Sequence, residues 1–138
     1  MDRPQGATKL TIMSSSPPRV LVVDDSHVNL ELARAVLEAG GFEVDTALDA
    51  ARAREAVTRS LPDIVLMDIQ LPDVDGLQLM TEFKAHPRMR GIPIVAFTAY
   101  AMRGDEARFR AAGCDAYLSK PIEVATFAAS VRALLAAG

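Results

Sequence analysis

The sequence predicts an α/β fold with a five-stranded parallel sheet. Short apolar runs alternate with segments of helical periodicity, and this alternation repeats five times along the chain. The apolar runs are too short for helices, and most lack polar alternation, which is typical of strands buried on both faces. Parallel neighbours need a crossover that holds a helix, and the helical segments between the runs meet that need.

Length and composition fit one globular domain. The chain has 138 residues, of which 50% are hydrophobic and 24% charged, with a formal net charge of −3. The acidic balance and the lack of a basic run argue against bulk attraction to nucleic acid. The single Cys114 rules out an internal disulfide, and no apolar stretch approaches the roughly 20 residues that span a bilayer. Because the N-terminus also lacks the apolar core of a signal peptide, we expect a cytoplasmic protein.

The first 18 residues differ from the rest of the chain. They read MDRPQGATKLTIMSSSPP, show no periodicity and end in serine and proline. This composition is typical of a disordered leader or a linker. We therefore assign the folded domain to residues 19–138 and the leader or linker to residues 1–18.

Five segments are predicted to form the strands of the sheet. They are Val20–Val23, residues 42–47, Ile64–Met67, residues 92–99 and Ala116–Ser119. The first, third and fourth are continuous apolar runs, which indicates strands covered on both faces. Residues 42–47 alternate instead, as expected of an outer strand.

A helix is predicted after each strand, from apolar residues at helical spacing. The apolar positions are Leu30, Ala33, Val36 and Leu37 in the first helix, Ala53, Ala56 and Val57 in the second, Leu77, Met80 and Phe83 in the third, and Val124, Phe127, Val131, Leu134 and Leu135 in the fifth. The fourth helix, residues 103–112, is polar. Asp49 can cap the second helix, and glycines at Gly40-Gly41 and Gly113 end the first and fourth. The third ends near His86-Pro87.

Five β-α pairs have a compact solution, in which two helices cover one face of the sheet and three the other. The strand order 2-1-3-4-5, the flavodoxin-like (βα)5 arrangement, satisfies the right-handed crossover rule. Strands one, three, four and five are then neighbours. In such sheets, functional groups lie beyond the carboxyl ends of the strands.

Five polar residues end or follow these neighbouring strands, and they are Asp24, Asp25, Asp68, Thr98 and Lys120. Each alone has an ordinary explanation as a turn, cap or solvated residue. Together they converge on one edge, where closely spaced carboxylates need a compensating cation. Mg²⁺ is suited to that task, because it prefers carboxylate and water ligands.

This set of residues fits phosphoryl transfer to Asp68. A carboxylate nucleophile can accept a phosphoryl group and form an acyl phosphate. The transfer depends on positioning and on neutralising charge at the phosphoryl oxygens. A metal ion held by Asp25 and Asp68 would take one oxygen, while Lys120 and the Thr98 hydroxyl would bind the others.

The motifs VDD, LMDIQLPDVDG, TA and SKP, in this order and spacing, resemble the receiver domain of bacterial two-component response regulators. The resemblance covers residues 19–138. The stretch FTAYAMRGDEARFRAAGCDAYLSKPI also looks like single-domain cell-division regulators of the DivK type and like the receivers of hybrid histidine kinases. One departure is that a glycine is common where Ala50 or Ala51 stands after Asp49; this concerns a helix start and not the site.

The resemblance implies a role for each site residue. Asp68 would be the phosphoacceptor, and Thr98 and Lys120 would bind the phosphoryl group. The ligands of Mg²⁺ would be Asp24, Asp25, Asp68 and the backbone carbonyl of Gln70. Tyr117 would turn inward when Thr98 moves toward the phosphate, and the Lys120-Pro121 peptide is expected to be cis.

The function implied is a phosphorylation-dependent signalling switch, not an enzyme that turns over a substrate. It would assist its own Mg²⁺-dependent phosphorylation and dephosphorylation. A sensor histidine kinase or a histidine phosphotransfer protein would donate the phosphoryl group, docking on the first helix near Ser26, His27 and Leu30. A downstream regulatory protein would read a face formed by the fourth helix, fifth strand and fifth helix. The residues expected on that face are Tyr100, Met102, Arg103 and Tyr117. Nucleic acid, membrane and small-molecule substrates other than phosphodonors are not expected as partners.

Three rival activities lack their motifs. A flavin-binding flavodoxin needs an uncharged phosphate loop where DDSHVN is acidic. A P-loop nucleotidase needs GxxxxGK[ST], which is absent. A haloacid-dehalogenase-type phosphatase needs an acid where Gln70 stands. The alternative that stays open is that the chain is one receiver module of a hybrid histidine kinase or a longer response regulator.

Overall fold

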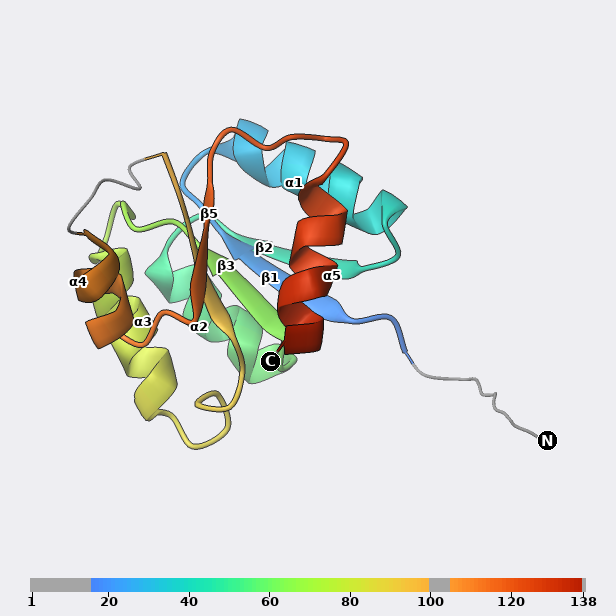
Figure 1. Cartoon of the computed structure of the whole chain (residues 1–138). Helices are drawn as coiled ribbons and strands as arrows, with labels where there is room; N and C mark the ends of the chain where they lie inside the picture. Colours follow the sequence, from blue (N-terminus) through green and yellow to red (C-terminus); the bar gives the residue numbers. More distant parts are fainter. Residues whose placement is uncertain (1–15, 100–104, 138) are drawn as a thin grey trace.

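The computed structural model describes residues 16–99 and 105–137, and within them five strands alternate with five helices. The elements are β1 (Arg19–Val23), α1 (His27–Ala39), β2 (Glu43–Ala47), α2 (Ala50–Arg59), β3 (Ile64–Met67), α3 (Gly76–Ala85), β4 (Ile94–Thr98), α4 (Asp105–Ala111), β5 (Ala116–Ser119) and α5 (Phe127–Ala137). All strand pairs are parallel, and the order is β2-β1-β3-β4-β5. The predicted fold class and strand order are therefore confirmed (Figure 1).

The helices divide between the two faces of the sheet as predicted. Buried residues of α2, α3 and α4 share one apolar cluster with alternate strand residues, and those of α1 and α5 share the other. Figure 1 shows α1 and α5 on one side of the sheet and the other three helices across it. The central strands β3 and β4 are buried at every residue, which explains their unbroken apolar sequence.

Side-chain caps start three of the helices close to the ends of the preceding strands. Ser26 accepts the Asn29 N–H at 3.2 Å at the start of α1, and Asp49 accepts the Arg52 N–H at 2.8 Å at the start of α2. Asp75 accepts the Leu77 N–H at 2.9 Å at the start of α3. These bonds satisfy N–H groups that a helix cannot pair internally. They hold short loops at the edge of the sheet where the acidic residues lie.

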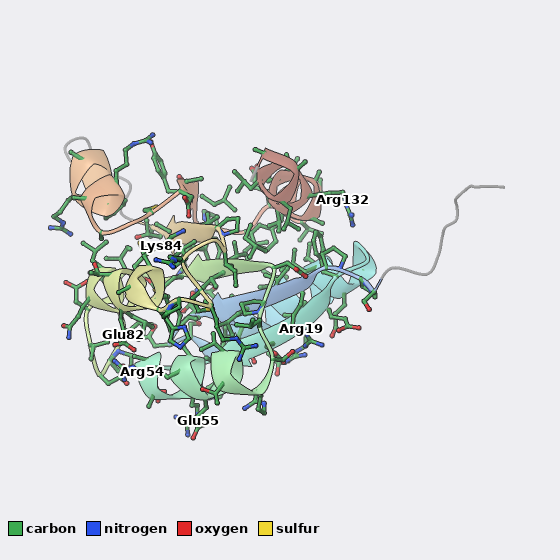
Figure 2. All side chains as sticks on the ribbon, turned by 90° about the horizontal axis from the view of Figure 1, so that it is seen from below. Arg19, Arg54, Glu55, Glu82, Lys84 and Arg132 are labelled. Atoms are coloured by element: carbon green, nitrogen blue, oxygen red, sulfur yellow. The ribbon has the colours of Figure 1, made fainter. Side chains whose placement is uncertain are left out.

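An ion pair joins two helices on the same face. The guanidinium of Arg54 on α2 donates to both carboxylate oxygens of Glu82 on α3, at 2.7 and 2.9 Å. Figure 2 shows the two side chains pointing toward one another. Both are partly exposed, so the pair contributes about 0.5 kcal/mol or less in salt. Its effect is mainly to keep α2 and α3 in register.

The final helix differs from its prediction at one position. Val124 was expected on the apolar stripe, but α5 begins only at Phe127 and the Val124 side chain is 64% exposed. Residues 124–126 form a turn instead, in which the Thr126 and Phe127 N–H groups both donate to the Glu123 carbonyl. Val124 thus keeps the helical spacing of the apolar stripe, although it lies before the first residue of α5.

Other boundaries shift by a few residues or fall outside the described ranges. The predicted strand 92–99 is shorter, as β4 spans Ile94–Thr98. Most of the predicted leader, residues 1–15, and the start of the predicted helix 103–112 lie outside the described residues. Gly113 follows α4 with φ +105°, a left-handed conformation that suits glycine as a helix stop. Within the described part of the chain, no helix has the length and apolarity needed to cross a membrane.

Candidate functional site

Three carboxylates meet at the carboxyl ends of two paired strands. Asp24 and Asp25 directly follow β1, and Asp68 directly follows β3. The last strand residues, Val23 and Met67, are partners in the parallel register. The Asp68 N–H also donates to the Val23 carbonyl at 2.8 Å, which extends the pairing by one residue. The register of the sheet thus brings the acids side by side.

The carboxylates form a compact cluster with unequal exposure. One oxygen from each of Asp24, Asp25 and Asp68 lies within 4.8 Å of the others. Asp24 is 0% exposed and Asp68 6%, whereas Asp25 faces solvent. Among the described residues, this is the single group of three or more acidic, histidine or cysteine side chains arranged to hold a metal ion.

Lys120 joins the cluster from the end of β5. Its Nζ lies 2.6 Å from Asp24 Oδ2 and 3.1 Å from Asp68 Oδ2. The same ammonium lies 5.2 Å from the centre of the Phe97 ring, which covers it from the side of the core. The Lys120-Pro121 peptide is cis, as expected.

Thr98 and Lys120 are linked through the backbone. Thr98 is the last residue of β4 and is buried, and the Lys120 N–H donates to its carbonyl at 3.0 Å. Tyr117 lies on the neighbouring edge strand β5, where its side chain is 36% exposed. The predicted switch pair therefore sits on adjacent strands, with Thr98 at the level of Ser119.

Burial and pairing act in opposite directions on the pKa values of the site. Burial raises the pKa of Asp68, although hydrogen bonds from Gln70 and Lys120 work to lower it. Burial also works to lower the pKa of Lys120, but the hydrogen bonds and charges of Asp24 and Asp68 outweigh it and raise that pKa. The bonds from Gln70 and Lys120 alone would lower the pKa of Asp68. Burial and the negative charge of Asp24 outweigh them, so the pKa of Asp68 is raised. The site favours a further positive charge.

Additional residues orient the carboxylates, and the sequence alone did not single them out for this purpose. The Ser26 N–H donates to Asp24 Oδ1 at 2.9 Å, and the Asn29 side-chain amide lies 3.4 Å from Asp24 Oδ2. The Gln70 N–H donates to Asp68 Oδ1 at 3.1 Å. Gln70 itself is exposed and pairs with Asp75 across the loop that follows β3. Such contacts depend on loop conformation, which residue spacing does not reveal.

Gly76 allows this loop to pack directly against the start of α3. A Cβ at this position would lie 2.3 Å from the Asp68 carbonyl oxygen and 2.7 Å from Ile69 Cα. Real atoms cannot approach so closely, so only glycine fits. The Gly76 N–H donates to the Ile69 carbonyl at 2.8 Å, which closes the loop.

The donor set suits a hard divalent cation. All three ligating groups are carboxylates, and the three carboxylates and one ammonium leave two negative charges at the cluster. Mg²⁺ binds oxygen ligands at about 2.0–2.1 Å in octahedral geometry, so its ligand atoms lie roughly 3–4 Å apart. The spacing of the carboxylate oxygens is compatible with this arrangement.

The residues predicted to dock the phosphoryl donor differ in their exposure to solvent. His27 is exposed, but Leu30 is buried in the core and cannot contact a partner, so that part of the prediction is wrong. Leu30 belongs with Ala33 and Leu37 to the buried apolar stripe of α1, which faces the core. The exposed apolar residue at this end of α1 is Val28, at 75%. Three residues predicted on the partner-reading face, Tyr100, Met102 and Arg103, lie outside the described residues.

Comparison with protein families identifies one match. Residues 20–132 match the family model described as the response regulator receiver domain. Among curated proteins, the chain is 41% identical over 119 residues to the polar-differentiation response regulator DivK of Brucella anthropi. That alignment covers 86% of this chain and 97% of the relative.

Solved structures agree with this match. The receiver domain of a sensor histidine kinase from Pseudomonas aeruginosa, described with a magnesium ion coordinated in its active-site cleft, superposes with a TM-score of 0.78 at 32% identity. The match covers 87% of this chain and 98% of that one. The chemotaxis response regulator CheY4 of Vibrio cholerae gives a TM-score of 0.81 over 86% and 98% of the two chains. Its identity is 23%, so it bears on the fold alone.

Proposed function

Because the chain belongs to the response regulator receiver domain family, we propose that it is a signalling switch operated by phosphorylation of Asp68. One observation carries the proposal. The buried Asp68 carboxylate lies within 4.8 Å of two further carboxylates and 3.1 Å from the Lys120 ammonium. Three carboxylates and one ammonium thus lie at one edge of the sheet, and these are the kinds of group that phosphoryl transfer requires.

The reaction is nucleophilic displacement at phosphorus. An Asp68 oxygen attacks the phosphorus of a phosphohistidine, and a P–O bond forms as the P–N bond breaks. The electron pair of the broken bond stays on the imidazole nitrogen of the donor. The Gln70 N–H and Lys120 each hold one carboxylate oxygen, which fixes the orientation of the Asp68 carboxylate before the attack.

The remaining residues neutralise charge. When held by Asp24, Asp25, Asp68 and the Gln70 carbonyl, Mg²⁺ would offset negative charge on the phosphoryl oxygens. Lys120 already contacts Asp68, so it can transfer its hydrogen bond to a phosphoryl oxygen with little movement. The Thr98 hydroxyl would bind a further oxygen at the end of β4.

The switch would connect Asp68 to the face formed by α4, β5 and α5. Phosphorylation adds negative charge and acceptor oxygens, which attract a neighbouring hydroxyl and so bias a two-state element. We assign that element to Thr98 and Tyr117. Tyr117 lies on the edge strand β5 next to β4 and is 36% exposed, so a change in its position would alter the surface that a partner contacts. A downstream regulatory protein would distinguish the two positions.

The phosphoryl donor would be a sensor histidine kinase or a histidine phosphotransfer protein in the cytoplasm. We assign its docking to α1 and the loop after β5, where Val28 and Val124 are exposed apolar residues. Each lies four positions after a residue of the site, Asp24 or Lys120.

Phosphorylation with a small phosphodonor tests the proposal. The protein is incubated with acetyl phosphate and Mg²⁺, and the modified residue is mapped after hydroxylamine treatment, which cleaves an acyl phosphate. We expect a hydroxylamine-sensitive phosphoryl group on Asp68, lost in Asp68→Asn. Asp45→Asn is the matched control, because Asp45 lies on the edge strand β2, away from the acidic cluster, and its described ion pair is with Arg19. A stable adduct elsewhere, or none in the wild type, would disprove the assignment.

The domain is either a single-domain response regulator or, as the alternative, a receiver module within a hybrid histidine kinase or a longer response regulator. The similarity to the Pseudomonas aeruginosa kinase receiver favours it. Immunoblotting of the source cells separates the two settings. A free-standing regulator migrates near the 14.8 kDa of this chain, whereas a module belongs to a larger species.

A further inference from the structure

The loop between β3 and α3 carries two groups of the proposed site, the Asp68 carboxylate and the Gln70 carbonyl. The base of the loop is closed by local bonds, from the Gln70 N–H to Asp68, from the Gly76 N–H to the Ile69 carbonyl, and by the pairing of Gln70 with Asp75. Asp73 lies between these paired positions, in the exposed outer part of the loop. The local bonds join the two ends of the loop to each other, whereas holding its outer part in place takes a contact with another element.

Asp73 connects this outer part to a different helix. Its Oδ1 accepts the Ala50 N–H at 3.0 Å, and its Oδ2 accepts the Ala51 N–H at 3.1 Å. Its Oδ1 also accepts the N–H of its neighbour Val74 at 3.0 Å. A carboxylate at the start of a helix is favoured by the unpaired N–H groups and the helix dipole. These bonds lower the pKa of Asp73, and the bond from the Ala50 N–H contributes most to the shift. Asp73 therefore stays ionised.

Helix α2 is a firm support for such a connection. Three of its alanines, Ala50, Ala53 and Ala56, are buried against the sheet, and Arg54 joins it to Glu82 on α3. The side chain of its own cap, Asp49, accepts from the backbone N–H and the guanidinium of Arg52, whereas the Ala50 and Ala51 N–H groups donate to Asp73. The alanines that replace the usual glycine are thus bound to the loop after Asp68, a relation that the sequence did not suggest.

We propose that Asp73 is a positioning residue, which holds the β3–α3 loop against α2 and so places the Gln70 carbonyl and Asp68 for binding a divalent cation. This inference rests on the proposed function, because it assumes that the cluster binds Mg²⁺. Asp73 lies three positions after Gln70 and five after Asp68. Loss of its bonds releases the outer part of the loop from α2, so that the Gln70 backbone is held by its local bonds to Asp68 and Asp75 alone.

A purely structural role for Asp73 as a cap of α2 is the competing explanation. Asp49 distinguishes the two explanations, because it caps the same helix at 2.8 Å while the described bonds of its side chain go to Arg52 and not to the loop. Asp49→Ala and Asp73→Ala both remove acceptors from the start of α2. Only Asp73→Ala detaches the loop. Asp73→Asn keeps one acceptor oxygen in place of two, and therefore retains part of the connection.

Calorimetric titration of the full chain with Mg²⁺ as the sole ligand measures the effect. We expect the dissociation constant to rise about tenfold in Asp73→Ala, as found when groups that orient metal ligands are removed, and by a smaller factor in Asp73→Asn. Asp49→Ala should bind as the wild type does. Unchanged affinity in both Asp73 variants, or an equal loss in Asp49→Ala, overturns the proposal.

Amide hydrogen exchange of the metal-free protein supplies a second measurement. We expect faster exchange at Gln70 and Val74 in Asp73→Asn, and unchanged exchange there in Asp49→Ala. If the wild type binds no Mg²⁺, the proposed function fails. Exchange at Gln70 still decides whether Asp73 holds the loop, and an unchanged rate in the Asp73 variants contradicts that role.

Discussion

Lys120 lies closer to Asp24 than to Asp68, with its Nζ at 2.6 Å from the former and 3.1 Å from the latter. The ammonium is therefore shared between a carboxylate that would bind metal and the one that would accept the phosphoryl group. It supplies the single positive charge within this cluster of three acids, as far as the described contacts extend. When the Asp68 carboxylate is modified, Lys120 keeps a partner on Asp24.

Replacing Lys120 should destabilise the protein most when no metal is present. Lys120→Met leaves the buried Asp24 and Asp68 without their cation, at a cost of about 3 kcal/mol in the free energy of unfolding. Added Mg²⁺ should restore more stability to this variant than to the wild type. Denaturant unfolding with and without Mg²⁺ measures both effects. Lys84→Met is the control, since Lys84 pairs with Asp115 and has no contact with the acidic cluster; an equal Mg²⁺ response in both variants would refute the prediction.

Asp68→Asn should stabilise the metal-free protein at neutral pH. Because burial raises the pKa of Asp68 in the folded state, the folded protein holds this proton more tightly than the unfolded chain. The free energy of unfolding therefore falls as pH rises from the ordinary carboxyl value of about 3.9 through the raised pKa. Asparagine carries no charge and avoids this loss, while Lys120 keeps Asp24.

The pH dependence of that difference is the decisive measurement. The stability gap between Asp68→Asn and the wild type should be largest above the raised pKa and close as pH falls below the ordinary value. Thermal unfolding in chelator-containing buffers across the acid range follows the gap. A gap of constant size at all pH values would exclude a raised Asp68 pKa as its cause.

Magnesium should stabilise the wild type and not a variant that lacks the exposed ligand. At ten times its dissociation constant, a ligand that binds only the folded state contributes about 1.4 kcal/mol. Asp25 is exposed, so Asp25→Asn should change the metal-free stability by no more than about 0.5 kcal/mol. The rise in melting temperature on adding Mg²⁺ should nevertheless be lost. A full response in Asp25→Asn would remove Asp25 from the ligand set.

Gly76→Ala should disturb both stability and phosphorylation. The added methyl group would lie 2.3 Å from the Asp68 carbonyl oxygen, so the loop must shift, at a cost of about 3 kcal/mol. Gly91→Ala is the matched control, because nothing lies within 4 Å of its Cβ position, and it should stay within about 0.5 kcal/mol of the wild type. Urea unfolding gives the stabilities, and acetyl phosphate labelling gives the phosphorylation rates. Similar behaviour of the two variants would show that the close approach at Gly76 is unimportant.

Much of the fold could be predicted because strands and helices leave different periodicities in the sequence. Ile64–Met67 and Ala116–Ser119 have the predicted bounds, and the strand order is the flavodoxin-like one that was predicted. Val124 was placed wrongly, because apolar spacing does not show where a helix begins. Leu30 was also assigned to a docking surface, although it belongs to the apolar stripe of the first helix, and that stripe faces the core.

The clustering of the acidic residues at one edge of the sheet could be predicted because of the topology of the fold. In a parallel sheet all carboxyl ends lie at one edge, so Asp24, Asp68 and Lys120 had to be close once the strand order was known. The roles given to these residues, by contrast, stay proposals that the experiments above test. The sequence offered no signal for the supporting contacts of Ser26 and Asn29 with Asp24.

The sequence by itself determined the order of the elements, the edge at which the acids gather and the family to which the chain is similar. Only the tertiary structure decided how the loop after Asp68 is held. Gly76 packs beneath it, and Asp73 reaches the N–H groups of Ala50 and Ala51, more than 20 positions earlier in the chain. Periodicity reports which side of an element is buried, because burial follows apolar spacing. A hydrogen bond between distant segments depends on backbone conformation and packing, which the three-dimensional fold alone supplies.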